Sequence, residues 1–136
     1  MTESLASFVL AKVADSTRLL ELSDVREIVP AMSLSLSSSM GGRCRGIANV
    51  RGEIVPVFDL EARGGELDPS QLIIIAGQPQ SHFVGLLVDD VLEIVHLPRS
   101  AVIHHSAGAG RAARTVNLRG TPVAVLTAAE VLSAAS

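Results

Sequence analysis

Short aliphatic runs separated by turn signals recur along the chain, and this pattern predicts an all-β protein. The stretch Val25–Val29, "VREIV", alternates apolar and charged residues like a half-buried strand, and Pro30 ends it. Leu72–Ala76, "LIIIA", does not alternate, so we expect it to be covered on both faces. The other strand candidates are Phe8–Val13, Arg18–Leu22, Ile47–Val50, Glu53–Phe58 and the first part of Phe83–Val95.

Small and polar residues mark the connections between these strands. Ser33–Gly46 and His104–Val116 are rich in small residues and are predicted as loops. Glu61–Gln71 contains two glycines and a proline, which makes it the best candidate for a boundary between two halves of the chain. Near the end, Thr127 can cap a short C-terminal helix that has Glu130 at its third position.

Two motifs occur twice in the same order. "VREIV" at Val25 is echoed 66 residues later by "VLEIV" at Val91, and "NVRG" at Asn49 is echoed 68 residues later by "NLRG" at Asn117. Nearly equal offsets predict two related β units, and chance similarity between aliphatic strands is the alternative explanation. Barrels suit two units of this size, because closure removes exposed edge strands.

Composition and charge narrow the function classes. The 136 residues are 48% hydrophobic and 18% charged, which is typical of a folded core. No apolar run approaches the ~20 residues of a membrane span, and the N-terminus lacks the basic start of a secretory signal, so we expect neither membrane insertion nor export. A net charge of −3, with 2% aromatic residues, argues against nucleic-acid binding. The single cysteine, Cys44, fits a reducing compartment.

The sequence contains no catalytic constellation. No cysteine or carboxylate stands at metal-ligand spacing from His82, His96 or the pair His104–His105. The adjacent carboxylates Asp89–Asp90 would diverge in a strand, so a turn explains them better than an acid pair. We therefore expect no enzyme activity, no metal and no cofactor. Binding remains, and the Arg51–Gly52 turn between two apolar strands is either a solvated turn or a binding anchor.

Two motifs resemble signatures of the CheW-like chemosensory coupling proteins. Gly46–Leu60, "GIANVRGEIVPVFDL", resembles one family pattern almost throughout, and Phe83–Val91, "FVGLLVDDV", resembles a second. With the flanking strands, the resemblance covers roughly Phe8 to Leu132. It implies a single CheW-like domain over residues 1–136. Within it, the resemblance implies two packed SH3-like five-stranded β-barrel subdomains, at approximately residues 8–65 and 70–132.

The resemblance also implies a function. Family members are non-catalytic adaptors in the cytoplasm, where they join the cytoplasmic tip of methyl-accepting chemoreceptors to the regulatory domain of a CheA-type histidine kinase. They work in arrays that contain other CheW-like proteins. An apolar groove between the barrels would take the receptor's helical hairpin, with an arginine at its rim. The receptor-binding residues implied here are Val25, Glu27, Arg51, Gly52, Leu72 and Ile73.

The chain departs from the family pattern at three places. Arg18–Leu19 replaces the family's Tyr-Gly, the connector Glu61–Gln71 is short, and Ile103–Arg119 looks compressed. If a strand is missing from Ile103–Arg119, the second barrel is incomplete and kinase binding is weakened or lost, as expected for a shortened, FrzB-like member. The alternative function is a small ligand-binding β-barrel unrelated to signalling, which would need a pocket with convergent polar groups.

Overall fold

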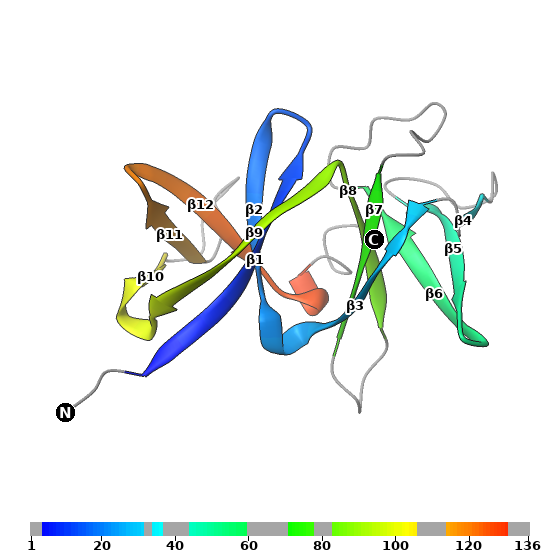
Figure 1. The fold of residues 1–136 in the computed structure, drawn as a ribbon, viewed down its shortest axis with the longest axis horizontal. Coiled ribbons are helices and arrows are strands. Elements are labelled where there is room, and N and C mark those ends of the chain that lie inside the picture. The colour runs from blue at the N-terminus through cyan, green and yellow to red at the C-terminus, as the bar shows by residue number, and fades with distance from the viewer. Residues whose placement is uncertain are drawn as a thin grey trace.

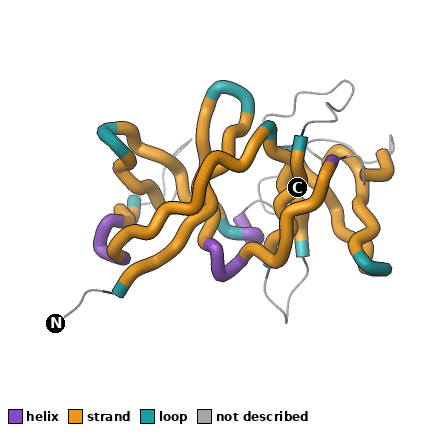
Figure 2. Tube along the Cα trace, in the orientation of Figure 1, coloured by secondary structure: helices purple, strands orange, loops and turns teal. Residues whose placement is uncertain are grey.

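Strands make up most of the fold, as the hydrophobic pattern predicts. The computed structural model describes residues 4–31, 34–36, 44–59, 71–77, 83–105 and 114–130. They form two six-stranded, curled sheets that lie side by side along the long axis of the molecule (Figure 1). Among the described residues, the helical segments are single turns between or after strands (Figure 2).

The first half of the molecule is built from a continuous set of strands. The order across the sheet is β3 (Val25–Pro30), β7 (Leu72–Ala76), β8 (Val84–Val88), β6 (Glu53–Phe58), β5 (Cys44–Val50) and β4 (Leu34–Leu36). Neighbouring strands are antiparallel, except that β8 and β6 are parallel.

The second half has the same arrangement, and its one parallel pair lies at the same place in the sheet. Two turns of 3-10 helix, η1 (Leu22–Asp24) and η3 (Arg99–Ala101), connect strands. The order across the sheet is β9 (Asp90–Pro98), β1 (Leu5–Val13), β2 (Ser16–Glu21), β12 (Thr121–Leu126), β11 (Arg114–Leu118) and β10 (Val102–His104).

The predicted division of the chain at residues 65–70 is wrong for the N-terminal hairpin. β1 and β2 belong to the second half, because β1 pairs with β9 from Leu5↔Pro98 to Lys12↔Asp90. The described chain therefore crosses between the halves at η1 and again at Asp89. Residues 60–70, where the boundary was expected, lie outside the described part. A hairpin's own pattern is local and does not specify which distant strand it joins.

The two SH3-like half-barrels are confirmed, each with five longer strands and one three-residue edge strand. The sequence left open whether a strand is missing from the second, and its described strands fill the same six positions as those of the first. β10 and β11 both fall in the segment that looks compressed, while residues 106–113 are outside the described part. The predicted loops are also too long, because β4 and the start of β5 lie within Ser33–Gly46.

The described residues form three hydrophobic clusters, one inside each half and one shared between the halves. β7 contributes to two of them, because Ile73 and Ile75 point into the first half while Ile74 and Ala76 join the shared cluster. This confirms that "LIIIA" is covered on both faces. β1 does the same for the second half, with Phe8 and Leu10 on one face and Val9, Ala11 and Val13 on the other.

The C-terminal helical turn at 128–130 begins as predicted. The backbone N–H of Glu130 donates to Thr127 Oγ1 at 3.1 Å, and the Thr127 hydroxyl donates to Glu130 Oε1 at 3.1 Å. These two bonds satisfy a free amide of the first turn and fix the direction in which the chain leaves β12.

Candidate functional site

The turn between β5 and β6 is as tight as a hairpin allows. Val50 pairs with Glu53, so Arg51 and Gly52 alone form the loop. Their φ angles are 54° and 85°, as in a type I′ turn, and the Gly52 N–H donates to Asn49 Oδ1 at 2.9 Å. A Cβ at Gly52 would meet nothing within 4 Å, so its positive φ, not the space around it, favours glycine.

Arg51 reaches from this turn to β3. Its Nη2 lies 3.3 Å from Glu27 Oε2, and the side chain of Arg51 is 78% exposed while that of Glu27 is 19% exposed. The second carboxylate oxygen, Glu27 Oε1, is buried and accepts no hydrogen bond within the described residues. The contact orients an arginine whose guanidinium is still open to a partner.

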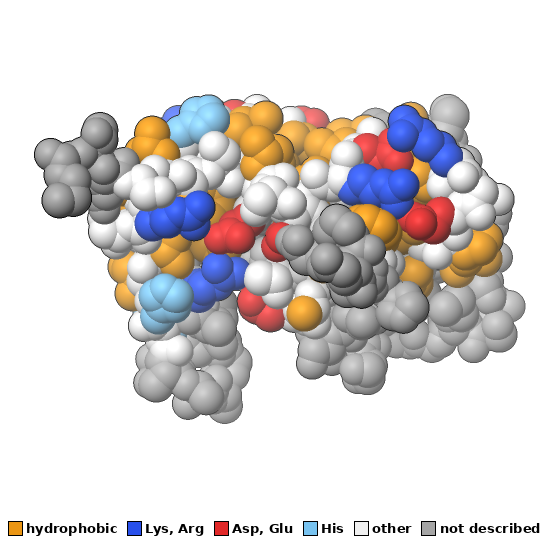
Figure 3. All heavy atoms as spheres, turned by 90° about the horizontal axis from the view of Figure 1, so that it is seen from below, with side chains coloured by type: hydrophobic (Ala, Val, Ile, Leu, Met, Phe, Trp, Pro, Cys, Tyr) orange, Lys and Arg blue, Asp and Glu red, His pale blue; other side chains and the backbone are white. Residues whose placement is uncertain are grey.

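A second ion pair joins β3 to the same hairpin from the outer face of the strand. Arg26 Nη1 pairs with Glu53 Oε2, and Arg26 Cζ lies 4.6 Å from the centroid of the Phe83 ring, within range of a cation–π interaction. Figure 3 shows opposite charges adjoining at this end of the molecule. Sequence reasoning missed these three residues, although the alternation of "VREIV" already puts Arg26 on the opposite face from Glu27.

Val25 begins β3 and is partly buried against the shared cluster. It lines an open hollow of about 430 Å³. The lining consists of apolar Val25, Gly77 and Phe83 with polar Ser23, Arg26 and Glu53.

Four of the six predicted receptor-binding residues line β3 and its neighbouring turn. We call Val25, Glu27, Arg51 and Gly52 the β3 surface. Leu72 pairs with Pro30 at the other end of β3 and packs against the shared cluster. Ile73 is fully buried inside the first half, so its side chain presents no surface to a partner.

The second half repeats part of this arrangement. Arg119 and Gly120 form the β11–β12 turn with φ angles of 51° and 86°, and Arg119 Nη2 lies 3.1 Å from Glu93 Oε1 on β9. The outer ion pair is not repeated, because Leu92 and Thr121 occupy the positions equivalent to Arg26 and Glu53. The two halves therefore share one ion pair and differ in the other.

The described residues include no cluster of three or more His, Cys, Asp or Glu that could hold a metal ion. They also include no helix long and apolar enough to cross a bilayer. Asp89 lies at the bend between β8 and β9, where its Oδ2 accepts the Ala14 N–H at 2.8 Å and its Oδ1 accepts from Gln71 Nε2 at 3.0 Å. This agrees with a turn at Asp89–Asp90 in place of an acid pair.

Comparisons with known proteins point in one direction. The family model of the CheW-like domain matches residues 7–136. A probable chemotaxis protein CheW from Rhizobium etli is 34% identical over 90 residues, which are 62% of this chain and 56% of that protein. The match thus spans little more than half of that relative. The crystal structure of scaffolding protein TtCheW from Thermoanaerobacter tengcongensis has a TM-score of 0.77 at 22% identity, over 91% of this chain and 85% of that chain. At this identity the likeness shows the fold.

Proposed function

Because this chain belongs to the CheW-like domain family, we propose that it is a non-catalytic chemosensory adaptor that joins chemoreceptors to a histidine kinase. Its partner on one side is the cytoplasmic helical hairpin of a methyl-accepting chemoreceptor. On the other side it binds the regulatory domain of a CheA-type kinase. It works in the cytoplasm, within arrays that contain other CheW-like proteins.

One observation supports receptor binding most directly. Arg51 is 78% exposed, yet its backbone is fixed by a two-residue turn and its guanidinium is held at 3.3 Å from Glu27. An arginine ordered before binding loses little freedom when a partner engages it. The hollow beside Val25 offers an apolar wall next to the Arg26–Glu53 pair, and an amphipathic helix presents the complementary pattern.

The proposal includes binding to the kinase. It does not include the weakened kinase binding that the sequence suggested for a chain lacking a strand in this region. That expectation rested on a strand missing between Ile103 and Arg119, and β10 and β11 both lie in this region. We expect the isolated regulatory domain of a CheA-type kinase to bind this protein in a titration calorimetry experiment. Absence of heat at protein concentrations well above micromolar would restrict the function to receptor binding alone.

Receptor binding is tested by titrating a soluble chemoreceptor tip fragment into this protein. We expect Arg51→Glu to weaken binding by about 2 kcal/mol, roughly thirtyfold, because loss of a central anchor has this size. Val25→Asp should also weaken it, since it charges the wall of the hollow. Arg119→Glu is the matched control, because it makes the same change at the equivalent turn of the second half.

A charge swap separates the ion pair from the arginine itself. If only the pair matters, Glu27→Arg combined with Arg51→Glu should restore binding to the fragment. If Arg51 contacts the partner directly, the swap should bind as weakly as Arg51→Glu alone. Circular dichroism of each variant confirms folding. Equal binding by wild type, Arg51→Glu and Val25→Asp would show that the β3 surface is not the receptor site.

A further inference from the structure

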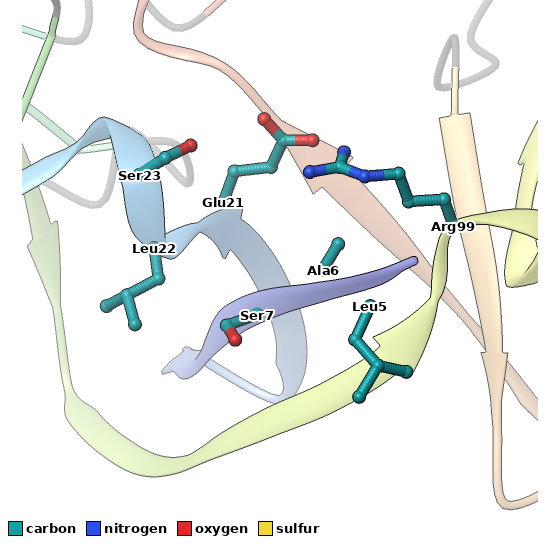
Figure 4. A pocket seen from close by; sticks show the side chains of 7 residues that line it. All are labelled: Leu5, Ala6, Ser7, Glu21, Leu22, Ser23 and Arg99. Atoms are coloured by element: carbon teal, nitrogen blue, oxygen red, sulfur yellow. The ribbon is translucent and has the colours of Figure 1, made fainter. Parts of the chain in front are cut away.

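The two crossings between the halves, at η1 and at Asp89, are each tied by a hydrogen bond to a strand or turn of the half that the chain enters. At η1 this tie consists of backbone atoms, because the Gly77 N–H donates to the Asp24 carbonyl at 2.8 Å. The side chains of Glu21, Leu22 and Ser23 at this crossing line an open pocket over β1 (Figure 4). The tie at η1 therefore depends on the backbone and not on a side chain.

The crossing at Asp89 is tied by its side chain as well as by its backbone. The Asp89 N–H donates to the Lys12 carbonyl at 2.8 Å, and Asp89 Oδ2 accepts the Ala14 N–H at 2.8 Å. Both partners belong to β1 and its turn in the second half. Asp89 Oδ1 accepts from Gln71 Nε2 at 3.0 Å, and Gln71 directly precedes β7 of the first half. One carboxylate thus binds a residue of each half.

Gln71 extends this connection to β3. Its carbonyl accepts the Ala31 N–H at 3.0 Å, directly after the end of β3. The hydrogen bonds therefore run from the end of β3 through Gln71 and Asp89 to the turn between β1 and β2. Gln71 is only 8% exposed, so losing its bond to Asp89 would leave a buried donor without an acceptor.

The turn that Asp89 holds has an unfavourable backbone conformation. Ala14 has a φ angle of 54°, in the left-handed region that residues with a Cβ seldom adopt. Such conformations persist where the surrounding structure constrains them strongly. Asp89 supplies this constraint, because it binds the N–H of Ala14 and the carbonyl of Lys12. The position of Asp89 is therefore coupled to the shape of this turn.

The shared hydrophobic cluster holds the two halves together but constrains their relative angle less. It contains Val9 and Ala11 of β1 together with Ile74 and Leu86 of the first half. Burial of apolar surface is non-directional, whereas a hydrogen bond requires a particular distance and angle. The bonds of Asp89 reach both halves at once, so they restrict how one half is turned against the other.

We propose that Asp89 and Gln71 form a clasp that sets the angle between the two halves, and that receptor binding depends on this angle. The dependence of receptor binding on the angle rests on the proposed function. Val25 of the β3 surface packs against the shared cluster, and Ser23 of η1 lines the hollow beside it. Turning one half against the other therefore reshapes this hollow. Asp89 acts as a positioning residue and not as a receptor contact.

The angle is measured by residual dipolar couplings of the backbone N–H groups in weakly aligned, isotope-labelled protein. In the wild type, one alignment tensor should fit both halves as they lie in the structure. Gln71→Glu sets a second carboxylate against Asp89, so the halves should lose this common orientation. The double variant Gln71→Glu with Asp89→Asn exchanges the acid and the amide. It again places a donor opposite an acceptor and should restore the wild-type couplings.

A second variant and a control complete this experiment. Gln71→Met removes the amide with little change in length and keeps the backbone bond to Ala31, so it should also change the relative orientation. Thr127→Ala is the control, because it removes an acceptor of the Glu130 N–H and leaves the clasp intact. Its couplings should fit one tensor, as in the wild type. A wild-type tensor in every folded Gln71 variant would overturn the clasp.

The same variants are then titrated with the soluble chemoreceptor tip fragment. Gln71→Met should weaken binding about threefold to tenfold, and the double variant should bind nearly as well as the wild type. Wild-type affinity in Gln71→Met, in a series where Arg51→Glu weakens binding, would overturn the dependence on the angle and leave receptor binding intact. No binding of the fragment to the wild-type protein would overturn the proposed function itself, while the couplings would still decide whether the clasp sets the angle.

Discussion

The two halves of this molecule reach the same sheet by different routes along the chain. In the first half, six consecutive strands from β3 to β8 make the sheet. In the second half, β9 to β12 take the positions of β3 to β6, and the N-terminal hairpin β1–β2 takes the positions of β7 and β8. The order of strands along the chain therefore repeats over four strands of each half, β3–β6 and β9–β12, and not over all six. The order of strands in a sheet depends on which strands pair in space, so a hairpin from either end of the chain can fill the same two positions.

The comparison also separates architecture from recognition. Both halves have an Arg-Gly turn with two positive φ angles and an ion pair from that arginine to a glutamate on the edge strand. Because this feature is present in both halves, it does not by itself distinguish the β3 surface from the second half. The outer pair Arg26–Glu53 and its contact with Phe83 occur in the first half, where the second half has Leu92 and Thr121. Specificity of the β3 surface should therefore come from these unshared residues together with the exposed Arg51.

Among the mutations that compare the two halves, those in the cores should change the free energy of unfolding most. Leu19 of the second half and Gly85 of the first are equivalent, since each pairs with the same position of its parallel neighbour. Leu19 is fully buried, so Leu19→Ala should lower the free energy of unfolding by about 2–5 kcal/mol through a cavity. Urea denaturation followed by circular dichroism measures it.

Gly85→Ala is the reciprocal experiment and should destabilise by overpacking. A Cβ there would lie 2.8 Å from Ile73 Cγ2 and 2.9 Å from Val57 Cγ2, so methyl groups must shift. We expect a cost of about 1–3 kcal/mol, measured in the same way. Stability equal to or above wild type would mean that the first half has room that its distances do not show.

The two turns should respond alike, because their geometry is the same. Gly52 and Gly120 have φ angles of 85° and 86°, and an added Cβ meets nothing within 4 Å at either. Gly52→Ala and Gly120→Ala should each cost about 1–2 kcal/mol, from backbone strain alone. Thermal or urea unfolding of the two variants should agree within experimental error. Costs that differ by more than about 1 kcal/mol would show that the turns are not equivalent.

The smallest effect concerns the outer ion pair, whose side chains are 36% and 47% exposed. A double-mutant cycle with Arg26→Leu and Glu53→Thr should give a coupling of about 0.5–1 kcal/mol, reduced by high salt. The reverse graft, Leu92→Arg with Thr121→Glu, should give a smaller coupling in the second half. A graft that couples as strongly as the original would mean that the Phe83 contact contributes nothing to the pair.

Much of the fold and part of the site could be predicted from the sequence. Alternation in Val25–Val29 and continuous burial of Leu72–Ala76 were readable because side chains in a strand alternate faces over a few residues. The Arg51–Gly52 turn and the Thr127 cap were readable because each depends on one or two residues. Local patterns could not show the position of Ile73. The family resemblance implies a receptor contact there, but the side chain is fully buried in the packed structure.

By itself, therefore, the sequence determined the strands, their turns and the family to which the chain belongs. Only the tertiary structure decided which sheet receives the N-terminal hairpin and which glutamate each of Arg26, Arg51 and Arg119 meets. The reason is the range of the interactions: β1 pairs with residues that are up to 93 positions away, from Leu5 to Pro98. Contacts of that range depend on the whole packed molecule, and local periodicity contains no information about them.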